Sequence, residues 1–295
     1  ATLKFDDNLP EELTGGIVQS GASYDALARF SNGSPNAQTP DAKGDTRGMA
    51  LKVFGVEGEK LFPDPGDPNV QDFIMISAPF FFINSAKNYT KFFEAVNEGS
   101  LWKIARIPFY LGLRGSAHAA KMMMQKIANP LETRYWSVVP SQLGTGEARQ
   151  AIKFSMRPLG PTNSTIPTNP GPNFLREAMK KTLSQGDYQM EFLIQRRGNS
   201  GFSVEDSVPE WTEDRAPFER VGVLTIHQQD FDTLEREAYC ENQSFNPWHS
   251  LEAHKPLGMI SRTRRVVYQA IAELRHDMNG TAYPGGLPAT EGASE

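Results

Sequence analysis

The chain has 295 residues, of which 39% are hydrophobic and 22% charged, a composition typical of an ordinary globular protein with one large domain or two small ones. Its net charge of −5, without a long basic run, argues against a nucleic-acid partner, and no apolar stretch is long enough to predict a transmembrane segment. The single cysteine, Cys240, excludes an intrachain disulfide and a cysteine-based zinc site.

The amino terminus and the lone cysteine bear on where the protein resides. No signal peptide precedes Ala1, and the chain does not begin with Met. A single cysteine suits a reducing compartment. We therefore expect a cytoplasmic protein, or a periplasmic one if an upstream signal has been removed. The sequence leaves open whether Ala1 is the native start and whether the chain forms a homo-oligomer.

The first part of the chain predicts short strands joined by turns. Apolar and polar residues alternate at 2–5 and 48–56, and further strand-like segments occur at 24–30, 72–76 and 80–83. Turn residues follow the second segment at 31–35, and residues 57–70 are rich in Pro and Gly. Strands with such short connections indicate an antiparallel sheet or barrel.

Helical patterns predominate after residue 86. We predict helices over 86–97, 101–128 (interrupted near Pro108), 174–184 and 231–276 (broken at Asn246-Pro247 and Pro256). Strands are predicted over 135–137, 151–156, 188–196 and 221–227. With no internal repeat and no long linker, we expect a single α+β domain over residues 1–280. A flexible C-terminal tail, rich in Gly, Pro, Ala, Thr and Glu, is predicted over 281–295.

The segment 258–280 carries the clearest functional pattern. It has good helix formers, no Pro, and a terminal Asn279-Gly280. At about 100° per residue, Arg264, Tyr268 and Arg275 fall within roughly 40° of one another. A phenol becomes a metal ligand when a metal and a nearby cation favour its phenolate form, and tyrosine is a known ligand of haem iron. The alternative is a packed helix with a core tyrosine and two surface arginines, because Arg-x-x-x-Tyr is common.

Several blocks along the chain together resemble the haem catalases in order and spacing. Four blocks resemble the early barrel strands of that family: Ala28-Arg29-Phe30-Ser31, residues 44–52 (GDTRGMALK), Gln71-Asp72-Phe73 and Phe81-Phe82-Ile83. Its distal-side segment resembles Asn129-Pro130 and Tyr135-Trp136-Ser137, and its proximal motif resembles Arg264, Tyr268 and Arg275. Residues 245–249 and 255–258 are most similar to short bacterial catalase-related haem proteins. Their relatives include peroxidases and allene oxide synthase-like enzymes acting on fatty-acid hydroperoxides.

The resemblance implies a fold and a cofactor. The fold is a catalase-type antiparallel β-barrel with surrounding α-helices, in one haem-binding domain over residues 1–280, and the cofactor is haem b. Tyr268 is then the ligand of the iron and Arg264 its charge partner. Arg29 and Arg275 contact the haem propionates, and Tyr135 stands near the position of a family phenylalanine that lies over a haem edge.

The resemblance also implies a distal side. Ser31 would brace a distal histidine there, Asn129 would supply the distal amide, and Arg264 completes the predicted catalytic set. Alternatively, Arg29, Ser31 and Tyr135 are structural strand residues. The family's distal histidine precedes the Arg-Phe-Ser block, and no histidine precedes Arg29 in this sequence. Either the natural N-terminus is missing, or the protein works without that base.

These features predict a haem-dependent enzyme that reacts with a small-molecule peroxide or hydroperoxide. We expect an organic or fatty-acid hydroperoxide peroxidase or lyase, with weak or no hydrogen peroxide dismutation, because a distal base normally contributes about 10² to 10⁴ in rate. Apolar contacts from Phe80, Phe81, Phe82 and residues 101–124 are candidates to place such a substrate. The alternative is a non-catalytic haem- or lipid-binding protein of the same fold.

Overall fold

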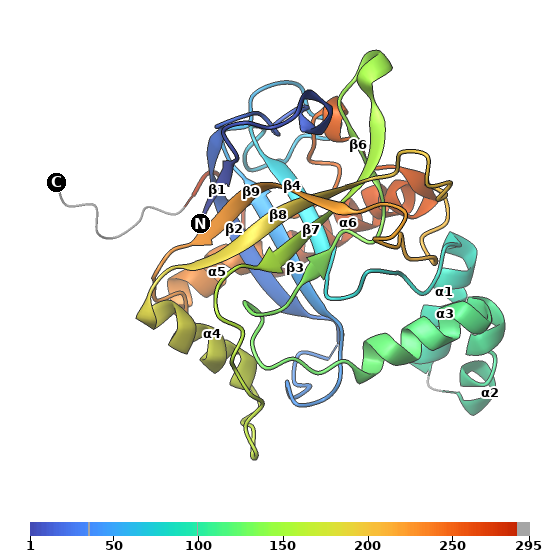
Figure 1. Cartoon of the computed structure of the whole chain (residues 1–295). Helices are drawn as coiled ribbons and strands as arrows, with labels where there is room; N and C mark the ends of the chain where they lie inside the picture. The colour runs from blue at the N-terminus through green and yellow to red at the C-terminus, as the bar shows by residue number, and fades with distance from the viewer. Residues whose placement is uncertain (35, 99, 288–295) are drawn as a thin grey trace.

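The computed structural model describes residues 1–34, 36–98 and 100–287 (Figure 1). Its strands are β1 (Thr2–Phe5), β2 (Ser23–Asn32), β3 (Arg47–Val53), β4 (Gln71–Ile76), β5 (Tyr135–Trp136), β6 (Ser141–Leu143), β7 (Gln150–Pro158), β8 (Tyr188–Arg196) and β9 (Phe218–Ile226). Its α-helices are α1 (Ala86–Glu98), α2 (Leu101–Ile104), α3 (Ile107–Met124), α4 (Phe174–Gln185), α5 (Leu234–Asn242) and α6 (Gly258–Asn279). Short 3₁₀ turns occur at Glu11–Leu13, Gly146–Ala148 and Glu252–His254.

The described strands form an antiparallel barrel. The neighbours follow the order β5-β4-β3-β2-β1-β9-β8-β7, and β5 pairs with β7 to close the ring, while β6 extends from β7 alone. Few residue pairs close the ring. β5 pairs with β4 only through Ile76 and Trp136, and with β7 through two residue pairs. Closing the ring removes the free edges that an open sheet of these strands would expose.

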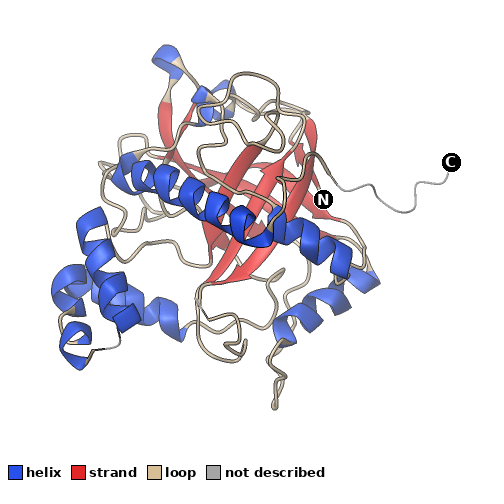
Figure 2. Cartoon of the chain, turned by 180° about the vertical axis from the view of Figure 1, so that it is seen from behind, coloured by secondary structure: helices blue, strands red, loops and turns tan. Residues whose placement is uncertain are grey.

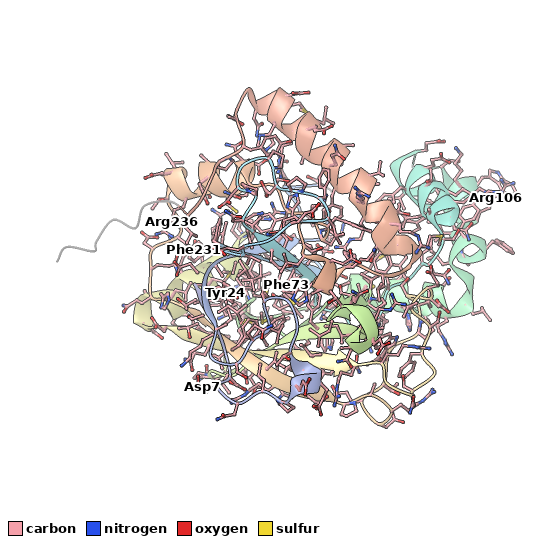
Figure 3. The ribbon with its side chains drawn as sticks, turned by 90° about the horizontal axis from the view of Figure 1, so that it is seen from above. Asp7, Tyr24, Phe73, Arg106, Phe231 and Arg236 are labelled. Carbon is pink, nitrogen blue, oxygen red and sulfur yellow. The ribbon has the colours of Figure 1, made fainter. Side chains whose placement is uncertain are left out.

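The barrel interior is the hydrophobic core. Phe73 of β4 is 4% exposed, and its ring lies 5.0 Å from that of Phe154 and 5.2 Å from that of Phe192, both edge-to-face. Figure 3, looking down on the molecule, shows Phe73 near the centre of the barrel. Burial of this apolar core, of which these aromatic side chains form part, is the main favourable contribution to folding.

The long helix α6 lies outside the barrel wall (Figure 2). Side chains alternate along a strand, so Ala28 and Phe30, which pack against the core, leave Arg29 and Ser31 on the outside. Figure 2 shows α6 crossing the outside of the sheet. α6 therefore lies outside the barrel, on the side of the wall that carries Arg29.

The most substantial error in the predicted elements is the strand at 80–83. These residues belong to no strand and form bends and irregular loop. The Phe80 ring stacks 3.8 Å from the ring of His118 on α3, the Phe81 amide donates to the Ser207 carbonyl, and Ser207 Oγ donates to the Ile83 carbonyl. The apolar run packs on a helix and a loop instead of pairing with a strand.

The other differences concern element boundaries. Ser31 and Asn32 continue β2 instead of forming a turn, and the short β6 was not predicted. The predicted helix 101–128 is interrupted between α2 and α3, so Pro108 lies in the first turn of α3, where the missing amide costs little. A second kink occurs at Gly112, whose φ of 68° is accessible to glycine.

Part of the predicted tail contacts the rest of the protein. The Tyr283 ring stacks 3.7 Å from the ring of His276, and the Tyr239 hydroxyl donates to the Gly286 carbonyl. Residues 288–295 of the predicted tail lie outside the described residues. Among the helices that the structure describes, none combines the length and the apolarity required to traverse a lipid bilayer.

The burial of His254 makes the stability of the protein depend on pH. The His254 ring is 4% exposed and accepts a hydrogen bond from the Ile17 amide at 3.0 Å, and burial lowers its pKa to about 4. An unfolded histidine has a pKa near 6.5, so between these values the unfolded state binds more protons. Neutral His254 thus makes its full contribution to the free energy of unfolding above pH ~6.5. About 3 kcal/mol of that contribution is lost by pH ~4.

We therefore expect His254→Gln to flatten the fall in unfolding free energy between about pH 6.5 and 4. Urea denaturation over a pH series measures this slope. The control is His227→Gln, at a histidine whose side chain is 49% exposed. An unchanged slope in His254→Gln would contradict the assignment.

Candidate active site

Tyr268 lies on α6, whose start is held firmly to the rest of the protein. Gly258 has a φ of +84°, and a side chain there would overlap the Val204 carbonyl oxygen. One turn later the Trp248 Nε1–H donates to the Ser261 carbonyl at 2.7 Å, and both residues are buried. These contacts set which face of the helix points toward the barrel.

Arg264 and Tyr268 form a direct pair. Arg264 Nη2 donates to the Tyr268 hydroxyl oxygen at 2.9 Å, and the guanidinium carbon lies 5.0 Å from the ring centroid. Both side chains are half-buried. Residues four apart on a helix are neighbours, so this contact follows from the sequence spacing. A charged donor on a phenol oxygen favours the phenolate form.

Two further guanidiniums gather near this pair. Arg275 Nη2 donates to the Gln243 carbonyl at 2.7 Å, whereas its buried Nε has no hydrogen-bond partner among the described residues, the Glu241 carboxylate being 4.0 Å away. Arg29 of β2 lies over the Phe245 ring, 4.5 Å from its centroid.

The pKa of Arg29 responds to burial and to its neighbours on α5 and α6. Burial lowers the pKa of Arg29 from its ordinary value, and the charge of Arg275 lowers it further, while Cys240, Tyr268 and Glu241 act in the opposite direction. Within the described residues Arg29 forms no ion pair, so the two arginines leave N–H donors available to an anion.

An aromatic cluster borders the pair on the side of α1. Burial raises the pKa of Tyr89, and the nearby Tyr268 and Arg264 also act on it, in opposite directions. The Tyr89 ring lies 4.7 Å from that of Phe93 and 6.2 Å from that of Phe82. On α6, Val267 and Ile271 are 48% and 58% exposed beside Tyr268. The phenol thus has apolar neighbours on two sides.

The structure brings some predicted site residues together and not others. Ser31 is exposed on β2, two residues beyond Arg29 on the same face, opposite Gly48 of β3. Tyr135 is fully buried in the barrel core, where its hydroxyl donates to the Pro130 carbonyl at 2.9 Å. For Tyr135 this favours the structural alternative.

Asn129 lies beside a different element. Its Nδ2 donates to Thr182 Oγ1 on α4 at 2.9 Å, and its Oδ1 accepts from the Leu131 amide at 3.0 Å. The amide therefore holds the turn before β5 against α4. Within the described residues, Asn129 forms no hydrogen bond with α6 or the outer face of β2, and its predicted distal role stays a prediction.

All five histidines are described, and each has partners elsewhere. His118 contacts the Phe81 carbonyl, and His227 contacts Thr2 and Asp187. His249, His254 and His276 contact Asp72, the Ile17 amide and the Thr281 carbonyl, respectively. No histidine of this chain is hydrogen-bonded to Tyr268 or Arg264.

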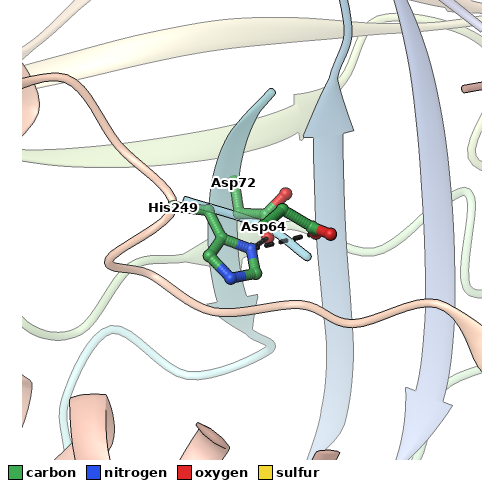
Figure 4. A group of neighbouring side chains, drawn as sticks. All are labelled: Asp64, Asp72 and His249. Atoms are coloured by element: carbon green, nitrogen blue, oxygen red, sulfur yellow. Dashed lines mark hydrogen bonds and ion pairs between the residues drawn. The ribbon is translucent and has the colours of Figure 1, made fainter. Parts of the chain in front are cut away.

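A buried charge cluster of Lys52, Asp64, Asp72 and His249 was missed by sequence reasoning (Figure 4). Lys52 Nζ lies 2.7 Å from an Asp64 oxygen and 2.9 Å from an Asp72 oxygen, and His249 Nδ1 lies 2.8 Å from Asp72 Oδ2. Asp64, Asp72 and His249 are close enough to hold a metal ion, with ligand atoms within 4.8 Å of one another. The Lys52 ammonium already supplies the positive charge there, so the arrangement fits a salt-bridge cluster better than a metal site.

The cluster attaches the segment before α6 to the barrel. Lys52 is on β3 and Asp72 on β4, whereas His249 follows Phe245, the ring under Arg29. Burial alone would raise the pKa of Asp64, but the hydrogen bond from His249 and the charge of Lys52 hold it well below its ordinary value. Burial alone would lower the pKa of His249, but its hydrogen bonds to Asp64 and Asp72 raise it.

Comparison with known proteins identifies the fold. No family model and no curated protein matches the chain. Two of the matching solved structures are a fungal catalase, with a TM-score of 0.69 and 16% identity, and catalase A from Saccharomyces cerevisiae, with a TM-score of 0.67 and 13% identity. They cover 96% and 97% of this chain, which spans 58% and 62% of their own lengths. The predicted catalase-type barrel with surrounding helices is confirmed.

Proposed function

We propose that this chain is a haem-dependent enzyme that reacts with peroxides and holds the iron through Tyr268. The observation that carries the proposal is the hydrogen bond from Arg264 Nη2 to the Tyr268 hydroxyl, at 2.9 Å. A phenol that receives a hydrogen bond from a cation is suited to bind iron as an anion. A tyrosine with only a packing role would not require a cationic donor on its oxygen.

The remaining charged groups fit haem b. Its two propionates are anions, and Arg29 and Arg275 contribute guanidiniums near Tyr268, with the buried Arg275 Nε lacking a hydrogen-bond partner in the described chain. Arginine keeps its charge when desolvated and binds carboxylates well. When bound, haem supplies the redox chemistry that cleaves an O–O bond. Arg264 limits how much charge the Tyr268 oxygen donates.

The surroundings favour an organic or fatty-acid hydroperoxide as the substrate. Phe82, Tyr89 and Phe93 provide aromatic contacts, and Val267 and Ile271 expose apolar surface on α6. An apolar tail bound there would be positioned without a polar anchor. Ser31, exposed on the barrel face that carries Arg29, is the hydroxyl that we propose orients the peroxide.

We also propose that hydrogen peroxide dismutation is weak. That reaction depends on moving the peroxide proton, a contribution of about 10² to 10⁴ in rate when a base is positioned for it. Each histidine of this chain has other partners, as described above. Because hydrogen peroxide has no apolar part, the aromatic cluster cannot compensate by positioning it.

The test is turnover after reconstitution with hemin. We expect cumene hydroperoxide or a fatty-acid hydroperoxide to be consumed at least about tenfold faster than by the same concentration of free hemin. Hydrogen peroxide should show no comparable gain, because proton transfer is unassisted. A preference for hydrogen peroxide would contradict the proposed substrate class. Hemin binding without any rate above free hemin would favour the non-catalytic haem-binding alternative.

A further inference from the structure

A basic and apolar lobe projects from the barrel. Helices α1 to α3, here called the helical lobe, lie to one side of the barrel in Figure 1. Its most exposed apolar side chains lie in α2 and the first part of α3. Leu101, Trp102, Phe109 and Leu113 are 84%, 81%, 85% and 94% exposed.

The charges of this segment are opposite to those of the whole chain. Residues 86–124 contain six lysines and arginines and two glutamates, a net charge of +4 in a chain whose net charge is −5. No acidic residue occurs between Glu98 and Glu132, although the chain has 35 acidic residues in 295. Lys103 pairs with Glu98, whereas Arg106 and Arg114 form no ion pair within the described residues.

Two arginines lie in sequence among Leu101, Trp102, Phe109 and Leu113, which are here called the apolar tip. Arg106 lies between Trp102 and Phe109 in sequence, and Arg114 directly follows Leu113. Both arginines are exposed, and Figure 3 shows Arg106 at the outer end of the lobe, on the opposite side of the molecule from Phe231 and Arg236. Apolar residues including a tryptophan, flanked by arginines, are the pattern of segments that lie in a membrane interface.

We infer that the helical lobe docks on an anionic lipid bilayer, with Trp102 and its apolar neighbours at the level of the head groups. Side chains exposed by more than 80% project from the surface, and a bilayer can accept them without a matching groove. An anionic bilayer offers such a layer beneath a negative surface that attracts Arg106 and Arg114. A two-fold dimer through the same tips would instead bring like charges together. This inference goes beyond the proposed function and does not depend on haem.

The experiment uses the full chain and vesicles of phosphatidylcholine with or without phosphatidylglycerol. We expect the protein to sediment with the anionic vesicles and not with phosphatidylcholine alone. Trp102 is a specific reporter, because Trp211 and Trp248 are 3% and 7% exposed and Trp136 is half-buried. Its emission should shift to the blue on binding and be quenched by brominated phosphatidylcholine included in the anionic vesicles.

Variants separate the apolar and charged contributions. Leu101→Ser/Phe109→Ser/Leu113→Ser should reduce binding to background while leaving Trp102 in place. Arg106→Gln/Arg114→Gln should weaken it about thirtyfold, the factor expected for two cations near an anionic surface. Leu234→Ser, at a leucine that is 86% exposed on α5, is the control and should bind normally.

Two results would overturn the inference. One is that the unaltered chain fails to bind anionic vesicles. The other is that analytical ultracentrifugation detects a dimer that the triple serine variant dissociates, with no brominated-lipid quenching of Trp102, because the tip is then a contact between copies. Since the quenching measurement uses the unaltered chain, the inference stays testable even if a variant fails to fold.

Discussion

Replacing Tyr268 with Phe is expected to abolish the tyrosinate ligation of haem iron and to reduce hydroperoxide turnover to that of free hemin. The substitution removes only the oxygen that accepts the hydrogen bond from Arg264, so the ring and its apolar contacts remain. The absorption spectrum of the ferric protein reports the ligand directly. High-spin bands in the variant identical to those of the unaltered protein would exclude Tyr268 as the ligand.

The matched control is Tyr89→Phe. Tyr89 is a half-buried phenol near Arg264 and Tyr268, but it is on α1 and receives no hydrogen bond from Arg264. Its variant should retain the spectrum of the unaltered protein. The variants Arg29→Leu and Arg275→Leu should weaken hemin binding while keeping the ligand bands, because they remove proposed propionate contacts only. Loss of the bands in Tyr89→Phe as well would indicate a general disruption near α1.

Replacing Lys52 with Met is expected to lower the free energy of unfolding by about 3–5 kcal/mol, because it leaves two carboxylates buried with one fewer cation. Lys52 is 1% exposed and contacts both Asp64 and Asp72. Urea denaturation at neutral pH measures the change. The control is Lys4→Met, which removes the exposed Lys4–Asp7 pair and should change stability by less than about 1 kcal/mol. Equal effects of the two variants would mean that the cluster contributes no more than a surface pair.

The pH dependence of this cluster has two parts of opposite sign. The folded pKa of Asp64 is lowered, so its contribution is present above the unfolded value near 3.9 and is lost as the pH falls through the folded value. The folded pKa of His249 is raised, so its contribution is complete below about pH 6.5 and is lost as the pH rises through the folded value. The cluster should thus stabilise the protein most in mildly acidic solution.

The arrangement on α6 could be predicted because it lies within one helix. A period of 3.6 residues determines that Arg264, Tyr268 and Arg275 share a face, and the Arg264–Tyr268 contact is present. The approach of Arg29 from β2 did not follow from any local pattern, and only the resemblance to catalases suggested it. The ligand role of Tyr268 remains a prediction.

The features that sequence reasoning missed depend on pairing between distant segments. Lys52 and Asp72 face each other because β3 and β4 pair in one particular register, and His249 reaches them from a loop after α5. Neither register nor loop path can be derived from hydrophobic alternation. A similar limit explains the strand predicted at 80–83, since a short apolar run does not reveal whether it will pair with a strand or pack on a helix such as α3.

The position of the helical lobe has a mechanical consequence. The lobe is inserted between β4 and β5, the two strands that meet through the single pair Ile76 and Trp136. Elsewhere around the ring, as between β2 and β3 or β7 and β8, seven residue pairs hold the strands together. A force that displaces the helical lobe would therefore act on the β4–β5 pairing, which has the fewest residue pairs in the ring. Arg264 and Tyr268 lie one turn apart on a single helix. They would keep their positions relative to each other if β4 and β5 separated.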